Sequence, residues 1–338
     1  MSFSNNSSTI IRRSNKDIFS IYCNEKDQRL ICNCFDKDYN FYNSITILNK
    51  FIDFTNYSVS LGIDDTIYGV YKDNGIKYFE ISKDNTLSFN EIFTFNDEKF
   101  DLLFPYIKKV DNNLHLFYYV FNNEAPGTCA LFHHHNKNNI WTENKIDFLT
   151  HSILNNYCIS WVNNSPIVFY LNVVDGYEEV FLSRFNCNSL TWSTPLQITH
   201  SKKNKVYLSV LKDTMNFYHL TFCENEDNAY SVKYINGYLM DDGLDICNAK
   251  NISIPCACMY PNLIKHQSNI YLMWVEYNRL KTCSSSDLGN SWTNQTTDEF
   301  SIEEDFIKAN FLSNYKEDLV YNSTSVFTTS NDIALLGF

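Results

Sequence analysis

A repeat of about fifty residues runs along the whole chain and limits its fold more than any other feature. Its best-preserved segment is the octet Ser285–Trp292, which reads S-x-D-x-G-x-S-W. Four weaker octets also end in an aromatic residue, and they begin at Cys34, Ser82, His134 and Phe185. The third positions of the five octets are residues 36, 84, 136, 187 and 287, so the steps are 48, 52, 51 and 100 residues. The last step equals two repeats, and five octets in register exclude chance.

Short stretches rich in Tyr, Phe, Val and Ile recur in the same phase. They begin near Ile18, Thr66, Leu114, Pro166, Asn216 and Asn269, and a seventh begins near Asp318. We predict four strands, A to D, in each repeat, with the octet at the turn between strands C and D. The sequence contains no long amphipathic helical stretch. One four-stranded sheet cannot bury both of its faces, so several must pack radially. The sequence therefore predicts an all-β fold, a β-propeller of four-stranded antiparallel blades.

We expect one domain over residues 1–338, because no linker separates the repeats. The predicted repeats cover roughly residues 8–50, 56–97, 104–148, 155–199, 206–254, 260–300 and 305–338. They favour seven blades, with residues 9–13 as strand A of the first and residues 306–313, 318–323 and 332–338 as strands A, B and C of the last. The outer strand of that last blade is then missing, or is supplied by the extreme N-terminus. A six-bladed ring with an extra C-terminal segment is the alternative.

The octet has the chemistry of a tight turn. Its Asp can accept hydrogen bonds from nearby backbone N–H groups, its Gly permits a positive φ, and its Trp can bury a large ring against the next strand. The pattern resembles the Asp box of BNR-repeat propellers, the broad group that includes the sialidases, and the resemblance covers essentially the whole chain. It implies structural roles at the turns for Asp36, Asp84, Asn136, Asp287, Trp141, Trp192 and Trp292. It also implies that ligands meet the opposite face, formed by the D–A and B–C loops.

Five tyrosines stand where A strands are expected to begin. They are Tyr57, Tyr106, Tyr157, Tyr207 and Tyr260, and their spacings are 49, 51, 50 and 53 residues. On innermost strands, such rings could surround the channel mouth, stack on sugar rings and hydrogen-bond to hydroxyls. The alternative is that they wedge between neighbouring blades, which their repetition favours.

The resemblance to sialidases implies three arginines for a substrate carboxylate, a Tyr/Glu nucleophile and an acid/base Asp. The chain has five arginines, at positions 12, 13, 29, 184 and 279. Arg12 or Arg13 lies on the first A strand, and Arg279 lies in a B–C loop that could face the ligand side. This match is incomplete, so we assign no catalytic residue. The carboxylate pairs Asp64/Asp65, Glu178/Glu179 and Asp241/Asp242, with Glu303–Asp305, are expected in solvated loops, although two could form an acid/base pair or hold a cation.

No cofactor and no metal site is predicted. On a C strand, His133 and His135 share one face and His134 takes the other, but no third ligand lies at fixed spacing. The eleven cysteines are odd in number and dispersed, which indicates reduced, mostly buried thiols rather than a disulfide framework.

The formal net charge of −12 argues against nucleic acid or an anionic membrane as a partner. No secretory signal or transmembrane segment is read from the sequence, so the default expectation is a cytoplasmic protein. The main functional prediction is a non-catalytic binding platform for a glycan or a protein, using one face of the ring. The alternatives are a sialidase-like glycoside hydrolase and a structural component of a surface assembly.

Overall fold

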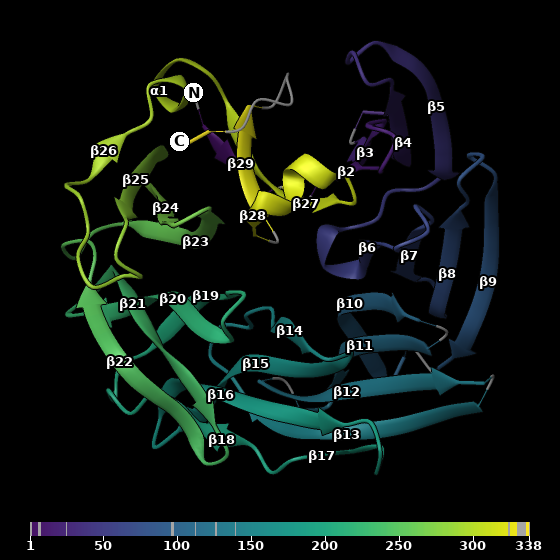
Figure 1. The fold of residues 1–338 in the computed structure, drawn as a ribbon. Coiled ribbons are helices and arrows are strands. Elements are labelled where there is room, and N and C mark those ends of the chain that lie inside the picture. The colour runs from purple at the N-terminus through teal and green to yellow at the C-terminus, as the bar shows by residue number, and fades with distance from the viewer. Residues whose placement is uncertain are drawn as a thin grey trace. The chain divides into compact units, whose positions relative to one another are not determined.

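The chain is built almost entirely of β-strands (Figure 1). The computed structural model describes residues 2–5, 8–24, 26–95, 98–111, 113–125, 127–138, 140–323, 325–329 and 336–337. The helical elements among these are one short α-helix, α1 (Phe300–Glu303), and two 3-10 turns, η1 (Phe54–Asn56) and η2 (Lys316–Val320). The chain divides into a first unit, Met1–Asn5, His151–Lys308 and Val320–Phe338, and a second unit, Asn6–Thr150 and Ala309–Leu319.

The second unit contains three antiparallel sheets, each formed by strands that follow one another in sequence. The first sheet has β2 (Thr9–Arg12), β3 (Ile18–Asn24), β4 (Arg29–Phe35) and β5 (Phe41–Leu48). The next has β6 (Tyr57–Leu61), β7 (Ile67–Lys72), β8 (Gly75–Ile81) and β9 (Leu87–Thr94). The third has β10 (Phe100–Val110), β11 (Asn113–Asn122), β12 (Thr128–Lys137) and β13 (Ile140–Thr150).

The first unit repeats this plan. One sheet has β14 (Cys158–Val162), β15 (Ser165–Val174), β16 (Tyr177–Asn186), and the short β17 (Thr191–Trp192) and β18 (Leu196–Gln197), both paired with β16. The next has β19 (Lys205–Lys212), β20 (Phe217–Glu226), β21 (Ala229–Met240) and β22 (Gly243–Asn251). Another has β23 (Cys258–His266), β24 (Asn269–Glu276), β25 (Arg279–Ser285) and β26 (Thr296–Thr297), with β28 (Tyr321–Asn322) on the free edge of β23.

The strand β27 (Phe306–Ser313) forms parallel pairs with both strands near the N-terminus. In the first unit, β1 (Phe3–Ser4) pairs with Phe306 and Ile307. In the second unit, β2 pairs with residues 310–313. The strand β29 (Ser325–Thr329) also pairs with β27 and lies beside β23.

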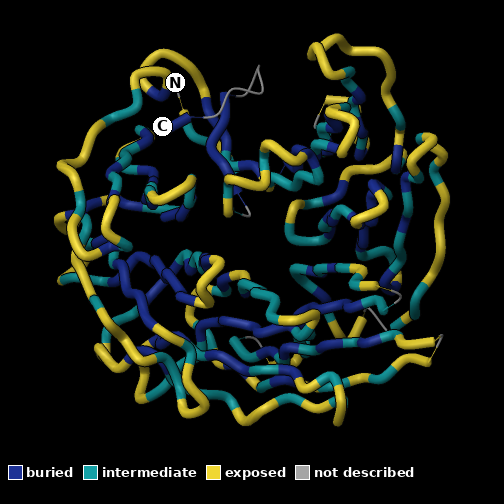
Figure 2. Tube along the Cα trace, in the orientation of Figure 1, coloured by how far each residue is buried: buried dark blue, intermediate teal, exposed yellow. Residues whose placement is uncertain are grey.

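Burial follows the position of a strand within its sheet. The second strand β20 is buried along eight consecutive residues, so both of its faces are covered, whereas the last strand β22 is mostly exposed (Figure 2). Neighbouring sheets supply the cover: in the first unit, β19 contacts β14, β15 and β16 of the preceding sheet and β23 of the following one. These contacts enclose apolar clusters that include Phe169, Leu220 and Trp274.

Asparagine-rich hairpins connect the strands. In the turns Asn163–Asn164, Asp227–Asn228 and Tyr277–Asn278, both residues have positive φ. Paired left-handed residues form type I′ turns, whose twist matches that of the flanking strands, and Asn and Asp tolerate this conformation better than most residues. The high Asn content of the sequence thus has a local structural use at these hairpins.

The structure confirms the predicted all-β class and the four-stranded antiparallel sheets. The described strands form six sheets. The segments predicted as a seventh repeat join two of these sheets: residues 306–313 form β27, while residues 318–323 fall in η2 and β28, which pairs with β23. Of the predicted strand at residues 332–338, only 336 and 337 are among the described residues. No helix in the described part of the chain is long and apolar enough to cross a membrane.

All eleven cysteines are described, and none forms a disulfide. Seven are buried, among them Cys32 and Cys34 of the first C-x-C pair on β4. These thiols therefore contribute small apolar side chains to the core.

Candidate functional site

The first strands of the three sheets in the first unit lie next to one another, because β19 contacts both β14 and β23. A tyrosine stands near the start of two of them, Tyr207 on β19 and Tyr260 on β23. The centroids of the two rings are 4.3 Å apart, with an angle of 42° between the ring planes. We call these residues the tyrosine pair.

Each member of the tyrosine pair occupies a β-bulge. The strand register shifts between Val206 and Ser209 on β19 and between Met259 and Asn262 on β23. Tyr207 has φ of 60° and Tyr260 has φ of 51°. A left-handed conformation costs a residue other than Gly about 1–3 kcal/mol, so it persists only where its surroundings enforce it.

Side chains around the tyrosine pair enforce this conformation. The backbone N–H of Tyr207 donates to Oδ1 of Asn155 over 2.8 Å, and Nδ2 of Asn155 donates to the carbonyl of Ile153 over 3.0 Å. The ring of Phe3 lies 5.2 Å from that of Tyr260, measured between centroids. The two rings are thus fixed at one edge of the sheets.

Lys308 on β27 lies beside this pair, with its Nζ 5.9 Å from the centroid of the Tyr260 ring. The loss of water around its ammonium lowers the pKa of Lys308 to about 8, although Cys158 and Cys223 oppose the shift. Burial, followed by the nearby Tyr260, raises the pKa of Tyr207 to about 12. Lys308 can therefore exchange between ammonium and amine close to neutral pH, while the Tyr207 hydroxyl keeps its proton.

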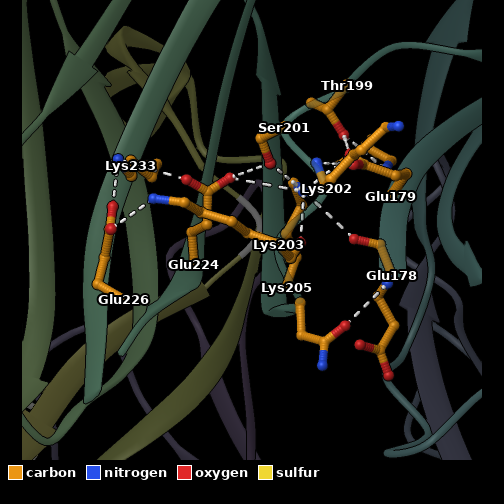
Figure 3. A network of polar contacts seen from close by, with 12 residues as sticks. Glu178, Glu179, Thr199, Ser201, Lys202, Lys203, Lys205, Glu224, Glu226 and Lys233 are labelled. Carbon is orange, nitrogen blue, oxygen red and sulfur yellow. Dashed lines mark hydrogen bonds and ion pairs between the residues drawn. The ribbon is translucent and has the colours of Figure 1, made fainter. Parts of the chain in front are cut away.

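A buried charge network lies at the start of β19, two residues before Tyr207. Figure 3 shows Lys205, which is fully buried, between carboxylates from two other strands. Its Nζ is 2.7 Å from Oε2 of Glu179 on β16 and 3.5 Å from Oε2 of Glu224 on β20. The ammonium also donates to Oγ of Ser201 and to the carbonyl of Lys203, each over 2.8 Å.

The network continues toward solvent from Glu224. Oε1 of Glu224 is 3.3 Å from Nζ of Lys233, and that nitrogen is 2.9 Å from Oε1 of Glu226. Lys203 also pairs with Glu226. The hydrogen bonds from Lys203 and Lys233 lower the pKa of the Glu226 carboxyl, so this end of the network is ionised at neutral pH.

The expectation that Glu178 and Glu179 lie in a solvated loop is wrong, since each is only 2% exposed. The strand β16 begins at Tyr177, so both residues belong to a hairpin that packs against β19 rather than to a free loop. Glu179 accepts from the backbone N–H of Lys202 over 2.8 Å and from the Thr199 hydroxyl. Glu178 accepts from the backbone N–H of Ser152 over 3.2 Å.

The other three predicted tyrosines have regular backbones. Tyr57 and Tyr157 are buried, at the start of β6 and immediately before β14. Tyr106 pairs with Phe117 on the neighbouring strand, and the left-handed residue of the β10 bulge is Phe104 instead, with φ of 53°. Phe104 is thus the counterpart of Tyr207 and Tyr260, so the tyrosine series is displaced by two residues in this sheet.

The predicted arginines have partners within their own units. Nη1 of Arg12 is 3.2 Å from Oδ1 of Asp318, and its guanidinium carbon lies 4.9 Å from the centroid of the Tyr315 ring. Nη1 of Arg279 donates to the carbonyls of Ser301 and Ile302 over 2.8 and 3.2 Å. Each guanidinium thus ties a terminal or helical segment to its sheet.

The octet at Ser285–Trp292 forms the expected tight turn. Asp287 accepts from the hydroxyl of Ser285 over 2.8 Å and from the N–H and hydroxyl of Ser291 over 2.8 and 2.7 Å. The hydrogen bonds from Ser291 are the main reason that the pKa of Asp287 falls to about 2. Gly289 has φ of 88°, and its N–H donates to Oγ of Ser285.

The weaker octets keep parts of this arrangement. Asp36 accepts from the backbone N–H groups of Asp38 and Asn40, each over 2.9 Å, and Asp84 accepts from the Ser82 hydroxyl. The aromatic positions pack unequally: ring centroids are 4.9 Å apart for Trp292 and Tyr234 and 5.3 Å for Trp192 and Phe185. Asn136 and Trp141 pair directly across β12 and β13, and Trp141 is 38% exposed.

The three consecutive histidines alternate across β12 as predicted. His133 and His135 are buried, and Nε2 of His133 is 3.0 Å from Nδ1 of His115 on β11. Burial is the main reason that the pKa of His115 falls to about 3. Burial also lowers the pKa of His133, so both imidazoles are neutral. In the described part of the chain, no group of three His, Cys, Asp or Glu side chains is placed to hold a metal ion.

Lys308 and Lys205 were missed by sequence reasoning. Lys308 is the single lysine within the strand Phe306–Ser313, and this was the available signal for it. Lys205 opens a strand, Lys205–Lys212, that also ends in a lysine, so no such signal was present there. The burial and the partners of both lysines depend on segments that are distant in the sequence, so a local sequence pattern cannot predict them.

No protein-family model and no curated protein matches the sequence. Solved structures do share its fold. One is an ulvan lyase from a new family of polysaccharide lyases, with a TM-score of 0.66 and 11% identity, covering 99% of this chain and 93% of that one. Another is a polysaccharide lyase with a TM-score of 0.56 and 10% identity, covering 87% of this chain and 81% of that one. A third is an α-L-arabinofuranosidase of Fusarium graminearum in complex with arabinobiose, with a TM-score of 0.51 and 10% identity, covering 82% and 94%.

These likenesses establish the fold, and they correct the main functional prediction. The three proteins named above are enzymes that act on glycans, which contradicts the predicted non-catalytic binding platform. The chain is thus an all-β propeller of the type found in polysaccharide lyases and glycoside hydrolases.

Proposed function

We propose that this protein is a glycan-cleaving enzyme that breaks a uronate-containing polysaccharide by elimination. Lys308 beside the tyrosine pair is the observation that carries the proposal. A partly buried lysine with a pKa of about 8 can act as a base near neutral pH, and Tyr207 retains a proton to donate. The shared fold with two polysaccharide lyases supports the same reaction class.

The proposed step balances within one sugar residue. The amine of Lys308 takes the proton from the carbon next to the uronate carboxyl group. The electron pair of that C–H bond forms a carbon–carbon double bond, and the glycosidic C–O bond on the neighbouring carbon breaks. The hydroxyl of Tyr207 gives its proton to the departing oxygen, and the ring of Tyr260 supports the sugar face. The products are an unsaturated uronate end and a new hydroxyl end.

Hydrolysis is the second candidate, and the fold likeness to the arabinofuranosidase favours it. Glycoside hydrolases commonly use two carboxyl groups, of which one must carry a proton. Glu179 and Glu224, the two carboxylates that contact Lys205 at the start of β19, are both buried beside its ammonium. Glu179 also accepts from the backbone N–H of Lys202 and Glu224 from the Ser201 hydroxyl, so both carboxylates are occupied by partners within the protein and neither suits the role of general acid.

The test uses a panel of neutral and uronate-containing polysaccharides and two readouts on each. Elimination gives new reducing ends together with ultraviolet absorbance from the unsaturated product, whereas hydrolysis gives reducing ends alone. We expect both signals with the wild-type protein, and we expect Lys308→Met to lower the rate about 10²–10⁴-fold, the usual contribution of a general base. Lys281→Met on β25 is the matched control, because its Nζ donates to Thr297 instead, and it should keep the wild-type rate. Reducing ends without absorbance would contradict elimination.

The octets support a finer structural assignment, to the Asp-box class of propellers. Hydrogen bonds within Ser285–Trp292, centred on Asp287 and Ser285, agree with that class. These hydrogen bonds stabilise the turn, and they have no part in the proposed elimination.

A further inference from the structure

The ion pair of Lys205 with Glu179 requires an explanation beyond stability. Both side chains are essentially inaccessible to solvent, with exposures of 0% and 3%. Removing two charges from water costs free energy that their attraction offsets only partly, so a buried ion pair is weak evidence for stabilisation. Such a pair can instead define one arrangement among several, because its hydrogen bonds are directional.

Lys205 joins three separate parts of the first unit. Glu179 comes from β16, Glu224 comes from β20, and Ser201 and Lys203 come from the segment that leads into β19. The same segment is held from the other side, because the backbone N–H of Lys202 donates to Oε1 of Glu179 over 2.8 Å. Ser201 donates to Oε2 of Glu224 over 2.6 Å. The segment that leads into β19 is thereby held against β20 of its own sheet and β16 of the preceding sheet (Figure 3).

The contacts of Lys205 lie directly before the bulge that contains Tyr207. Lys205 pairs with Glu224 and Val206 with Cys223, and the next regular pair is Ser209 with Thr221. The backbone of Tyr207 is thus held by the Lys205 network on its N-terminal side and by Asn155 at its own N–H. Because only Val206 separates Lys205 from Tyr207, a displacement of β19 at Lys205 would also displace Tyr207, whose backbone is in the left-handed conformation.

We propose that Lys205 is a positioning residue for the reaction at the tyrosine pair: its buried ammonium fixes the entry of β19 and so holds the Tyr207 hydroxyl in place for proton donation. This inference rests on the proposed function, since it assigns Tyr207 a part in the chemistry. Misplacing a reacting group by about 1 Å can cost about 10²-fold in rate. The effect should appear in kcat rather than in KM.

The test compares Lys205→Met with Lys233→Met in the full-length protein. Lys233 is the matched control: its ammonium contacts Glu224, Glu226 and Asn251, and none of these belongs to the segment before β19. We expect Lys205→Met to lower kcat about 10–100-fold with KM within about threefold. We expect Lys233→Met to leave both constants within about twofold, since the Lys233 side chain is partly exposed and contacts no residue of the segment before β19.

A second readout needs no turnover. Fluorotyrosine placed at position 207 gives a fluorine NMR signal that reports the surroundings of that ring. Lys205→Met should shift or broaden the signal, and Lys233→Met should leave it in place. A signal at the wild-type position in Lys205→Met, or an equal displacement in Lys233→Met, would overturn the proposal. This outcome is independent of whether the wild-type protein eliminates or hydrolyses, so it separates this inference from the proposed function.

Lys205→Met leaves two buried carboxylates with one fewer partner, and that could prevent folding. The double variant Lys205→Met with Glu179→Gln removes both charges of the closest pair and keeps the side-chain sizes. If the double variant folds, a displaced fluorine signal supports the positioning role, and an unchanged one contradicts it.

Discussion

At the scale of single residues, Lys308 makes the pH dependence of the proposed elimination predictable. Its amine must be free to accept a proton, and its pKa is about 8 because burial removes water from the ammonium. The rate of glycan cleavage should therefore rise with pH through about 8 and then level off, while Tyr207 stays protonated to about pH 12. Initial rates measured at pH values from about 6 to about 10, in steps of about half a pH unit, test this expected rise. A rate that falls over the same range would contradict the role of Lys308 as a base.

The same lysine links pH to stability. A lysine in the unfolded chain has its ordinary pKa of 10.5, so between pH 8 and 10.5 the unfolded state binds more protons than the folded state. Stability then rises with pH across this window, because a lowered lysine pKa penalises folding when the group is charged. We expect the unfolding midpoint of the wild type, relative to that of Lys308→Met, to increase from pH 8 to pH 10.5. Parallel thermal unfolding curves at both pH values check the difference.

Sequence periodicity selected part of the proposed site, and the reason for its limits is physical. Tyr207 and Tyr260 were found because a fifty-residue spacing survives along the chain. Tyr106 was aligned with them incorrectly by two residues, since a β-bulge shifts the register and Phe104 takes the left-handed position. Lys308 and Lys205 were not found, because burial by distant strands changes a lysine without leaving a local pattern.

At the scale of elements, the turn of the octet at Ser285–Trp292 depends on Gly289. A Cβ at this position would lie 2.1 Å from the hydroxyl oxygen of Tyr234, on a backbone with φ of 88°. Gly289→Ala should therefore destabilise the protein by about 2–4 kcal/mol, through backbone strain and steric displacement together. Gly176→Ala is the matched control, because φ there is 87° and nothing lies within 4 Å of the added Cβ.

Gly176→Ala should cost only the strain, about 1 kcal/mol. Urea unfolding of both variants measures the difference. If the two variants lost equal amounts of unfolding free energy, Tyr234 would have moved away from the added Cβ at no cost. Its contact with the turn would then contribute nothing to stability.

Strands and turns were the best-predicted elements. Alternation of apolar residues and the Asp and Asn turns are local signals, so the strands of most repeats were expected where the structure has them. The last repeat was harder, since β28 has two residues and gains its stability from pairing with Lys265 and His266 of β23. Short strands of this kind are defined by a partner far away in sequence, and β-propensity alone does not select them.

At the scale of the whole molecule, the net charge of −12 opposes the approach of a polyanionic glycan. Salt screens such repulsion, with a Debye length of about 30 Å at 0.01 M and about 8 Å at 0.15 M. We expect KM for a uronate-rich polymer to fall several-fold as salt rises across this range, and KM for a short neutral oligosaccharide to stay constant. A KM that rises with salt would indicate that a local cationic surface dominates over the net charge.

The parallel pairing of β2 with residues 310–313 sets an order of events during synthesis. The hydrophobic side chains of Ile10 and Ile11 leave the ribosome early, yet the strand that covers this edge of their sheet is made about three hundred residues later. Until then, β2 offers an open row of backbone donors and acceptors that a second nascent chain could occupy. Ribosome-bound fragments that stop before residue 306 should thus need a chaperone to remain monomeric, and fragments that extend well beyond residue 313 should not.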